Sequence, residues 1–265
     1  MKKLKVFSVY GISKTGKTTT IENIIREFKK RRYTVGSVKE IHYEDFSIDT
    51  KGTNTARHGK AGAEPVTARG YYETDILYSK RLSLDKILKH YSQDYVIFEG
   101  IEKGNFPKIL TASSLKEIDE RLNEMVFAIS GKISNQIDEY RNIPVIDAVK
   151  ETELLVDLIV EKVYEKLPDF PPECCTACGY SCRELGKKIL KGKAKRDDCI
   201  LSKSNIKLNI DGKGVDMVPF VQKLLNNAVL AVVSELEGYE KDSSIKVQIG
   251  GDKIRGELET KDDNI

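Results

Sequence analysis

A glycine-rich stretch near the N-terminus has the residue types and the spacing that bind phosphate. It runs Gly11-Ile-Ser-Lys-Thr-Gly16-Lys17-Thr18, follows the apolar run Leu4–Val9, and leads into a segment with apolar residues at helical spacing. Strand, glycine loop and helix are the context in which the pattern G-x-x-x-x-G-K-[ST] forms a phosphate-binding P-loop. The two glycines allow backbone conformations that a side chain would forbid.

Each part of this loop has an expected chemical role. The N–H groups of the loop and of the helix start point at the phosphates. Lys17 contacts the terminal phosphates, and Thr18 offers its hydroxyl to Mg²⁺. The other residues predicted to contact nucleotide here are Gly11, Ser13, Lys14, Thr15, Gly16 and Thr19. We therefore predict a nucleoside triphosphate site, GTP or ATP, with Mg²⁺; the alternative is a glycine-rich turn that arises by chance.

A second apolar run ends in an acid. Tyr95–Phe98 is followed by Glu99. In P-loop folds an acid at the tip of a buried strand near the phosphates supports Mg²⁺, directly or through water. Glu99 is therefore predicted to be a catalytic residue beside Lys17 and Thr18. The alternative is a strand that simply ends at the surface.

All five cysteines fall in one short segment, between Cys174 and Cys199. Four of them, Cys175, Cys178, Cys182 and Cys199, can hold a [4Fe–4S] cluster or a tetrahedral Zn²⁺ ion. Three ligands on one loop and a distant fourth favour iron–sulfur over zinc, whose ligands tend to come as two pairs. Free thiols are the third interpretation, and Cys174 is the spare cysteine.

The composition excludes several classes of protein. The 265 residues include 44 basic and 41 acidic side chains, a net charge of +3, so no global attraction to nucleic acid or to a membrane follows. No apolar run approaches 18 residues, and Met1 leads directly toward the first strand without a signal sequence. We expect a cytoplasmic protein that binds neither nucleic acid nor membrane.

Hydrophobic patterning predicts strands that alternate with helices. The expected strands are 4–9, 33–38, 70–78, 95–98, 108–111 and 125–130, and the expected helices are 17–32, 83–90 and 148–166. The intervening segment 39–65 is a long polar loop, a kind of loop that is usually functional or disordered. This alternation predicts an α/β fold with a mostly parallel sheet and helices on both of its faces.

Paired prolines, Pro171 and Pro172, predict a linker. The predicted division is a P-loop nucleotide-binding domain at 1–167, a four-cysteine iron–sulfur module at 168–201, a small α+β region at 202–250 and a disordered tail at 251–265. Within the third part we expect a strand over 205–211, a helix that begins at Pro219 and a strand over 244–249.

The first 165 residues resemble the molybdopterin-guanine dinucleotide biosynthesis protein B family, whose members are small P-loop GTPases. The resemblance rests on the loop Gly11–Thr18, on the run Asp49-Thr-Lys-Gly-Thr-Asn-Thr-Ala-Arg57-His58 with Gly62-Ala63 after it, and on Phe98–Lys103 with Pro107–Ile109. It implies a homodimeric GTP-binding adapter that works beside the nucleotidyltransferase attaching GMP to the molybdenum or tungsten pterin. Molybdopterin or tungstopterin is then a further candidate ligand.

The middle motif adds candidate site residues. Asp49 is a second candidate for the Mg²⁺ side, and Arg57 either contacts phosphate or pairs with Asp49. His42 and His58 are either phosphate or pterin contacts or plain solvated side chains. Lys103 and Lys108 are candidates for an anionic pterin phosphate, or ordinary surface lysines.

The chain departs from the family in two respects. Short members lack both the cysteine segment and the region after it. The usual guanine signature N-K-x-D is absent, because Asn135-Gln-Ile-Asp138 has Gln in place of Lys. The cysteine segment itself resembles a small iron–sulfur domain of electron-transfer and cofactor-handling proteins.

Three classes of function remain in view. The first is a GTP-binding adapter, a slow GTPase in molybdenum or tungsten cofactor synthesis that carries a [4Fe–4S] cluster. The second is an ATP-dependent redox or metallocluster-maturation protein that couples hydrolysis to electron or cluster transfer. The third is a carrier that binds nucleotide and pterin without turnover. No Gln or Asp stands at a recognised water-positioning place, so intrinsic hydrolysis is expected to be slow.

Overall fold

The structure is a computed structural model of the whole chain. It describes residues 4–170, 172–173, 175–176, 178–200, 206, 208–210, 213–215, 217–240 and 245–247. The chain divides into two compact units, Met1–Pro219 and Phe220–Ile265. None of the described helices combines the length and the apolar composition needed to cross a bilayer.

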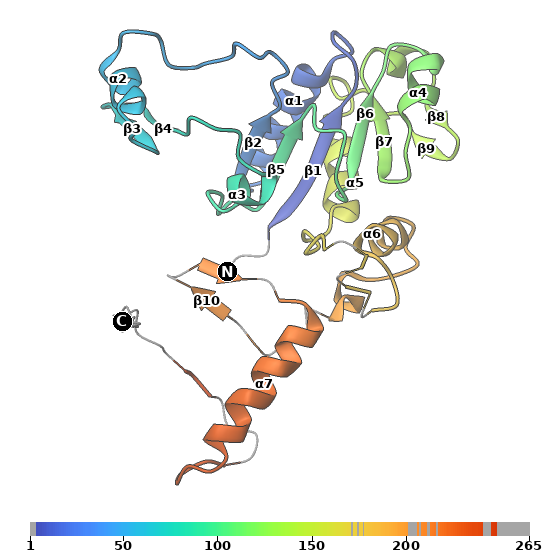
Figure 1. The fold of residues 1–265 in the computed structure, drawn as a ribbon. Helices are drawn as coiled ribbons and strands as arrows, with labels where there is room; N and C mark the ends of the chain where they lie inside the picture. The colour runs from blue at the N-terminus through green and yellow to red at the C-terminus, as the bar shows by residue number, and fades with distance from the viewer. Residues whose placement is uncertain are drawn as a thin grey trace, which may run out of the picture. The chain divides into compact units, whose positions relative to one another are not determined.

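A five-stranded parallel sheet forms the centre of the first unit (Figure 1). Its strands lie in the order β2 (Val35–Lys39), β5 (Tyr95–Glu99), β1 (Lys5–Tyr10), β6 (Lys108–Thr111) and β7 (Val126–Ser130). The three strands at the centre are buried almost throughout, as expected where helices cover both faces of a parallel sheet. The predicted α/β fold with a parallel sheet is confirmed.

Two helices cover one face of the sheet. Helix α1 (Lys17–Lys30) packs against α5 (Thr152–Lys162), and both contribute to the largest apolar cluster with Phe7 and Val9 of β1. The residues that α1 buries there are Ile21, Ile24 and Phe28, which follow the helical spacing seen in the sequence. Phe28 also stacks on Tyr95 of β5, with ring centroids 4.4 Å apart.

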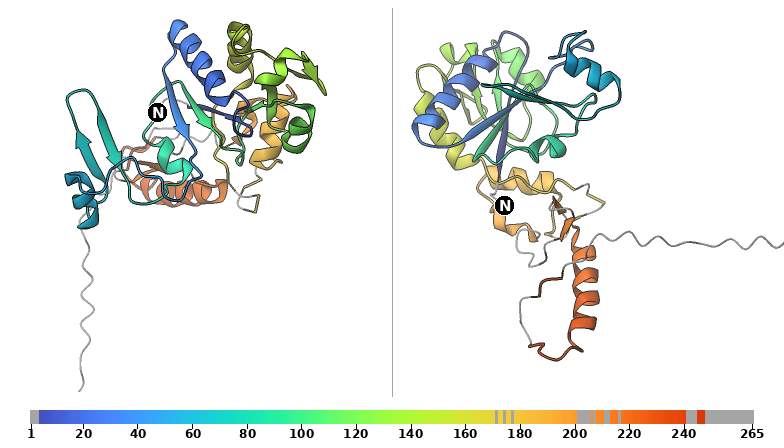
Figure 2. Two further views of the ribbon diagram at one scale, coloured as in Figure 1. Left: turned by 90° about the horizontal axis from the view of Figure 1, so that it is seen from above. Right: turned by 90° about the vertical axis from the view of Figure 1, so that its left-hand side faces the viewer.

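Shorter helices cover the opposite face (Figure 2). Ile118 of α4 (Leu115–Arg121) joins an apolar cluster under the β6 and β7 end of the sheet, and Leu88 of α3 (Leu84–Leu88) joins another under β5. The remaining short elements of this part are η1 (Lys132–Asn135), β8 (Glu139–Tyr140) and β9 (Ile143–Pro144). The sheet therefore has helices on both faces.

Helix α5 is shorter at both ends than the predicted span 148–166. At its start, the Asp147 carboxylate accepts hydrogen bonds from the backbone N–H groups of Val149 and Lys150, which holds them in a turn. At its end, Glu165 forms a β-bridge with Lys5. Side-chain capping and strand pairing therefore compete successfully with the helical pattern.

The long polar segment after β2 contains structure that the sequence analysis did not predict. Helix α2 (Asn54–Lys60) lies within it, capped by the Thr53 hydroxyl. The predicted strand 70–78 is half of a hairpin formed by β3 (Val66–Arg69) and β4 (Thr74–Leu77). Together α2 and the hairpin lie to one side of the central sheet (Figure 2).

The cysteine segment packs against the core of the sheet domain. Helix α6 (Cys182–Leu190) begins with a capping box between Ser181 and Glu184. Its buried face joins the same apolar cluster as α1 and α5. The contact is close, because a Cβ atom added at Gly186 would lie 2.4 Å from the Tyr164 hydroxyl. A short 3₁₀ helix, η2 (Arg196–Asp198), then leads to Cys199.

The rest of the chain is described in part. Strands β10 (Leu208–Ile210) and β11 (Lys213–Val215) pair antiparallel, and α7 (Pro219–Val233) begins at the predicted proline. Of the strand predicted over 244–249, residues 245–247 are described and are not in a strand. Cys174, residues 211–212 and the tail predicted over 251–265 lie outside the described residues.

Candidate functional site

The loop after β1 has the backbone geometry that a phosphate cradle needs. Gly11 has φ 150° and lies so close to β6 that an added Cβ atom would be 2.1 Å from the Thr111 carbonyl oxygen. Gly16 has φ 107°, a value that side chains rarely allow. The Thr15 hydroxyl contacts the Thr111 hydroxyl at 2.8 Å. The side chain of Thr15 therefore anchors the loop to β6.

The start of α1 is open to a ligand. Gly16 precedes the helix and provides no side-chain cap, and the first turn carries no acidic residue. The first N–H groups of a helix lack partners within the helix and attract anions. The phosphates of a nucleotide can satisfy them, as the motif predicts.

Lys17 folds back over the loop. Its ammonium donates to the Gly11 carbonyl at 3.0 Å and to the Ile12 carbonyl. Burial lowers the pKa of Lys17, while the carboxylate of Glu99 acts in the opposite direction. The ammonium thus lies at the centre of the loop, where terminal phosphates are expected.

Glu99 lies at the start of α1, although 81 residues separate it from Thr18. The Thr18 hydroxyl donates to its Oε1 atom at 3.0 Å, and the Lys39 ammonium forms an ion pair with the same oxygen. The side chain of Glu99 is only 12% exposed, so β5 does not simply end at the surface. Strand register explains the proximity, because Glu99 pairs with both Val9 and Lys39.

These residues enclose a pocket of about 410 Å³. It is lined by Ser13, Lys14, Gly16, Lys17, Thr18, Thr19, Lys39, Glu99 and Lys132. Four lysines against one carboxylate favour a polyanion. The hydroxyl of Thr18 and the carboxylate of Glu99 are the hard oxygen donors that Mg²⁺ takes, so the residues fit that ion. Lys39 and Lys132 were not among the predicted site residues.

The residues of the middle motif lie elsewhere. Arg57 and His58 are exposed on α2 and line neither this pocket nor the larger cleft of about 1590 Å³ beside the loop. The Asp49 carboxylate accepts hydrogen bonds from the Thr53 hydroxyl at 2.7 Å and from the Thr50 N–H. These bonds lower the pKa of Asp49. Among the described residues no ion pair joins Arg57 to Asp49.

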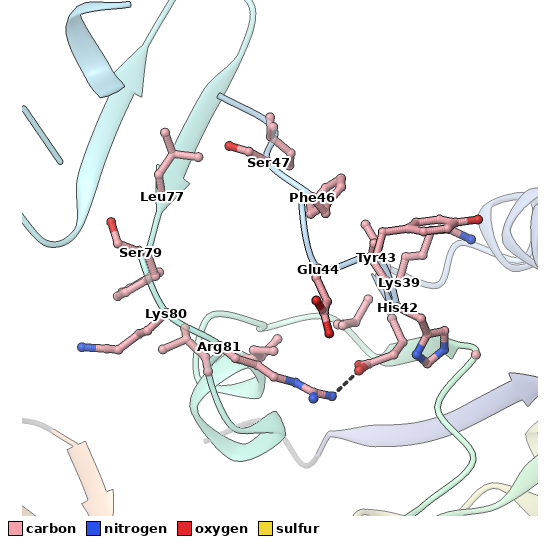
Figure 3. Close-up of a pocket in the computed structure, with 18 of the residues that line it drawn as sticks. Lys39, His42, Tyr43, Glu44, Phe46, Ser47, Leu77, Ser79, Lys80 and Arg81 are labelled. Atoms are coloured by element: carbon pink, nitrogen blue, oxygen red, sulfur yellow. Dashed lines mark hydrogen bonds and ion pairs between the residues drawn. The ribbon is translucent and has the colours of Figure 1, made fainter. Parts of the chain in front are cut away.

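A larger cleft, of about 1590 Å³, opens beside the loop (Figure 3). Its walls are the segment 38–51, the segment 76–84 from the end of β4 onward, and residues 100–103. An ion pair between Glu40 and Arg81 joins two of these walls. His42 and Lys103 line the cleft, as does Asp49.

Lys108 lies apart from both cavities, although it was a candidate for an anionic ligand. It is only 3% exposed, and its ammonium donates to the Gly104 carbonyl at 2.7 Å. Burial lowers the pKa of Lys108 to about 8. Its ammonium lies 5.1 Å from the centre of the Phe106 ring. In this structure Lys108 therefore contacts other residues of the protein interior, Gly104 and Phe106.

Four thiols of the cysteine segment are described, and none is in a disulfide. Cys182 and Cys199 are buried in the same apolar cluster, and Cys178 packs against it. Burial raises the pKa of Cys182, and nearby Cys199 adds to that effect. Cys175 is half-buried. Thiolate donors suit iron or zinc, but within the described ranges no three His, Cys, Asp or Glu side chains are grouped as a metal site.

Comparison with known proteins identifies the family. A profile of the family Molybdopterin guanine dinucleotide synthesis protein B matches residues 6–130. A protein of Methanocaldococcus jannaschii, provisionally named a molybdopterin-guanine dinucleotide biosynthesis adapter protein, is 31% identical over 261 residues, which cover 95% of this chain and 100% of the relative. The chain belongs to this family. Because that alignment is nearly complete, it includes the cysteine segment.

Other family members are similar over a smaller part of the chain. The adapter protein of Haemophilus influenzae is 28% identical over 145 residues, 51% of this chain and 79% of the relative. The crystal structure of Bacillus subtilis MobB superimposes with a TM-score of 0.52 at 22% identity, covering 61% of this chain and 99% of that one. That likeness supports the fold of the family. The Bacillus protein is shorter, so this chain is an extended member.

Proposed function

We propose that this protein binds GTP and Mg²⁺ and acts as an adapter in the synthesis of the molybdenum or tungsten pterin guanine dinucleotide cofactor. The observation that carries the proposal is the hydrogen bond from Thr18 to Glu99, which brings an acid to the end of a P-loop. Membership of the family supplies the pathway, because relatives are named as adapter proteins of molybdopterin-guanine dinucleotide biosynthesis.

Different residues of the pocket bind the phosphates and the Mg²⁺ ion. On binding, the Lys17 ammonium moves from the loop carbonyls to the terminal phosphates. The backbone N–H groups at the start of α1 donate hydrogen bonds to the phosphates. Thr18 and Glu99 hold Mg²⁺, which neutralises charge on the phosphates. Glu99 is the only carboxylate among the described residues that line the pocket, so a separate base is missing. Slow intrinsic hydrolysis follows.

Guanine selectivity rests on family membership. Asn135, the first residue of the altered signature, accepts a hydrogen bond from the Lys150 ammonium at 3.1 Å and lies in η1. Calorimetric titration with GTP and with ATP, each with Mg²⁺, separates this proposal from an ATP-dependent protein. Phosphate release measured with and without a nucleotidyltransferase then separates a GTPase from a carrier that never turns over.

We propose further that Cys175, Cys178, Cys182 and Cys199 hold a [4Fe–4S] cluster. Support comes from four unbridged thiols, from the burial of two of them in one apolar cluster, and from their spacing in the sequence. Anaerobic purification with assays for iron, labile sulfide and zinc tests this directly. Zinc in place of iron would make the segment a structural zinc site.

One observation favours the alternative of coupling nucleotide turnover to electron or cluster transfer. The buried face of α6 and the buried face of α1 belong to one apolar cluster. A movement of α1 on nucleotide binding could therefore be transmitted to the cysteines through this packed cluster. An altered cluster spectrum on addition of ATP and Mg²⁺, with hydrolysis, would favour this alternative over the adapter.

The partners follow from the family. We propose a homodimer that contacts the nucleotidyltransferase of the pathway and functions in the cytoplasm. Light scattering at micromolar concentration with nucleotide present tests the first part. A monomeric mass under those conditions would contradict it.

A further inference from the structure

Lys39 lies between the two cavities. It is the last residue of β2, and among the described residues it alone lines both the 410 Å³ pocket and the 1590 Å³ cleft. Figure 3 shows it on the same wall of the cleft as His42 and Tyr43. A movement of its side chain can therefore transfer a positive charge from one cavity to the other.

In the present structure the charge of Lys39 is used in the smaller pocket. Its ammonium pairs with Oε1 of Glu99, the same oxygen that accepts the Thr18 hydroxyl. Mg²⁺ needs those two oxygen donors, and its double positive charge repels an ammonium at the same oxygen. Mg²⁺ bound at Oε1 of Glu99 therefore competes with the Lys39 ammonium for that oxygen and weakens the ion pair.

Glu99 is the only acid among the described residues that line the smaller pocket. The only other anions for a released Lys39 ammonium there are the phosphates of the nucleotide, beside which Lys14, Lys17 and Lys132 already supply positive charge. The Lys39 side chain is 58% exposed and long enough to turn toward the cleft. The cleft carries seven lysines and arginines against four carboxylates. Among the described residues, Lys51, Lys60 and Lys103 of this set form no ion pair. Such a surface suits an anion.

We propose that binding of Mg²⁺ and nucleotide displaces Lys39 from Glu99 and makes its ammonium available to a second, phosphate-bearing ligand in the larger cleft. The inference rests on the proposed function, because it requires nucleotide at the P-loop. The cleft volume exceeds the usual range for small-molecule sites, about 300 to 1,000 Å³, so a cofactor-sized ligand fits. The two ligands then bind cooperatively, and each raises the affinity for the other by the same factor.

Calorimetry on the full chain tests the coupling with inorganic phosphate as the probe. The P-loop is first filled with a non-hydrolysable GTP analogue, and phosphate is titrated in with Mg²⁺ or with EDTA. In the wild type, Mg²⁺ should tighten phosphate binding at least about fivefold, the lower end of typical coupling between sites. Lys39→Met should abolish that difference and should leave Mg²⁺ binding to the nucleotide complex at least as tight, because Glu99 is no longer shared.

Lys103→Met is the matched control, because Lys103 lines the cleft and not the smaller pocket. It should weaken phosphate equally with and without Mg²⁺, so the ratio is kept; Lys39→Arg should also keep it. The proposal is overturned if phosphate does not bind, if the wild type shows no Mg²⁺ effect, or if Lys39→Met keeps the effect. Weaker nucleotide binding in Lys39→Met with an unchanged ratio would place Lys39 on the nucleotide instead. Failure of the analogue to bind at all would overturn the proposed function as well.

Discussion

Thr18 and Glu99 are joined by a hydrogen bond of 3.0 Å between the first turn of α1 and the end of β5. The bond places the expected metal ligands side by side before any ion is bound. Preorganisation of this kind lowers the cost of ordering a site when its ligand arrives. The arrangement depends on strand order, because β5 lies directly beside β1, the strand that leads into the loop.

The charge of Glu99 should control the effect of Mg²⁺. Glu99→Gln keeps a side chain of the same size but removes the negative charge that the ion needs. Nucleotide binding with Mg²⁺ should weaken about tenfold or more, whereas binding in EDTA should change little. Titrations with and without Mg²⁺ measure this. Glu102→Gln is the control, because Glu102 pairs with Arg121 outside the pocket; an equal loss in that variant would contradict the role of Glu99.

The close contact between α6 and Tyr164 predicts a size limit at Gly186. A methyl group there would lie 2.4 Å from the Tyr164 hydroxyl and 3.2 Å from Met125, both buried. Gly186→Ala should therefore destabilise the fold by about 1 to 3 kcal/mol through overpacking, offset in part by better helix propensity. Denaturant unfolding measures the change.

Gly59 provides the matched control, since it also lies in a helix but has its nearest neighbours 3.8 Å away. Gly59→Ala should be neutral or stabilising by up to about 1 kcal/mol. Equal effects of the two substitutions would show that α6 does not pack as described.

Burial of Lys108 should make stability depend on alkaline pH. The pKa of Lys108 is lowered to about 8, chiefly by burial, with Arg183 acting in the same direction and Glu102 and Asp169 opposing it. Between about pH 8 and pH 10.5 the unfolded chain holds the proton and the folded chain does not, so stability rises with pH. Lys108→Met lacks this group.

The measurement for Lys108 is the difference in unfolding free energy between wild type and Lys108→Met from pH 7 to pH 10.5. Relative to the variant, the wild type should gain stability between about pH 8 and pH 10.5 and should gain little below pH 8. Parallel curves for the two proteins would show that Lys108 titrates normally in the folded state.

The four Cys→Ser variants at the proposed ligands should all lose the metal, but they should differ in how far they lower the thermal midpoint. A single Cys→Ser substitution should in each case remove iron and labile sulfide at Cys175, Cys178, Cys182 or Cys199, because a cubane needs four thiolates. Cys174→Ser should keep both. Cys182→Ser and Cys199→Ser should also lower the thermal midpoint further than Cys175→Ser, because they place a hydroxyl in an apolar core. Loss of iron in Cys174→Ser with retention in Cys175→Ser would move the ligand set by one residue.

Much of the nucleotide site could be predicted from the sequence because it is built from local signals. The glycines of the loop Gly11–Thr18 indicate its backbone conformation directly from the sequence. The apolar runs of β1 and β5 indicate buried strands that end at the same edge of a parallel sheet. Lys39 could not be found in this way. It ends a short, half-exposed strand, and only the order of β2, β5 and β1 brings it to Glu99.

The segment after β2 shows where the sequence was insufficient. Helix α2 has seven residues and no buried side chain, so no apolar periodicity marks it. Arg57 and His58 are exposed on α2 and line neither cavity, so their predicted role as ligands stays a prediction. The packing of α6 was also missed, since a paired-proline linker gives no sign that the following helix returns to the core.

Calorimetric titration of the full chain with GTP and with ATP, in the presence of Mg²⁺, tests the central claim most directly. The account predicts GTP binding in the micromolar range or tighter, ATP binding at least about tenfold weaker, and no detectable binding of either in Lys17→Ala, which removes the ammonium beneath the terminal phosphates. Thermal unfolding of that variant should match the wild type. Equal binding of ATP and GTP would contradict the guanine adapter, and full affinity in Lys17→Ala would contradict the P-loop site itself.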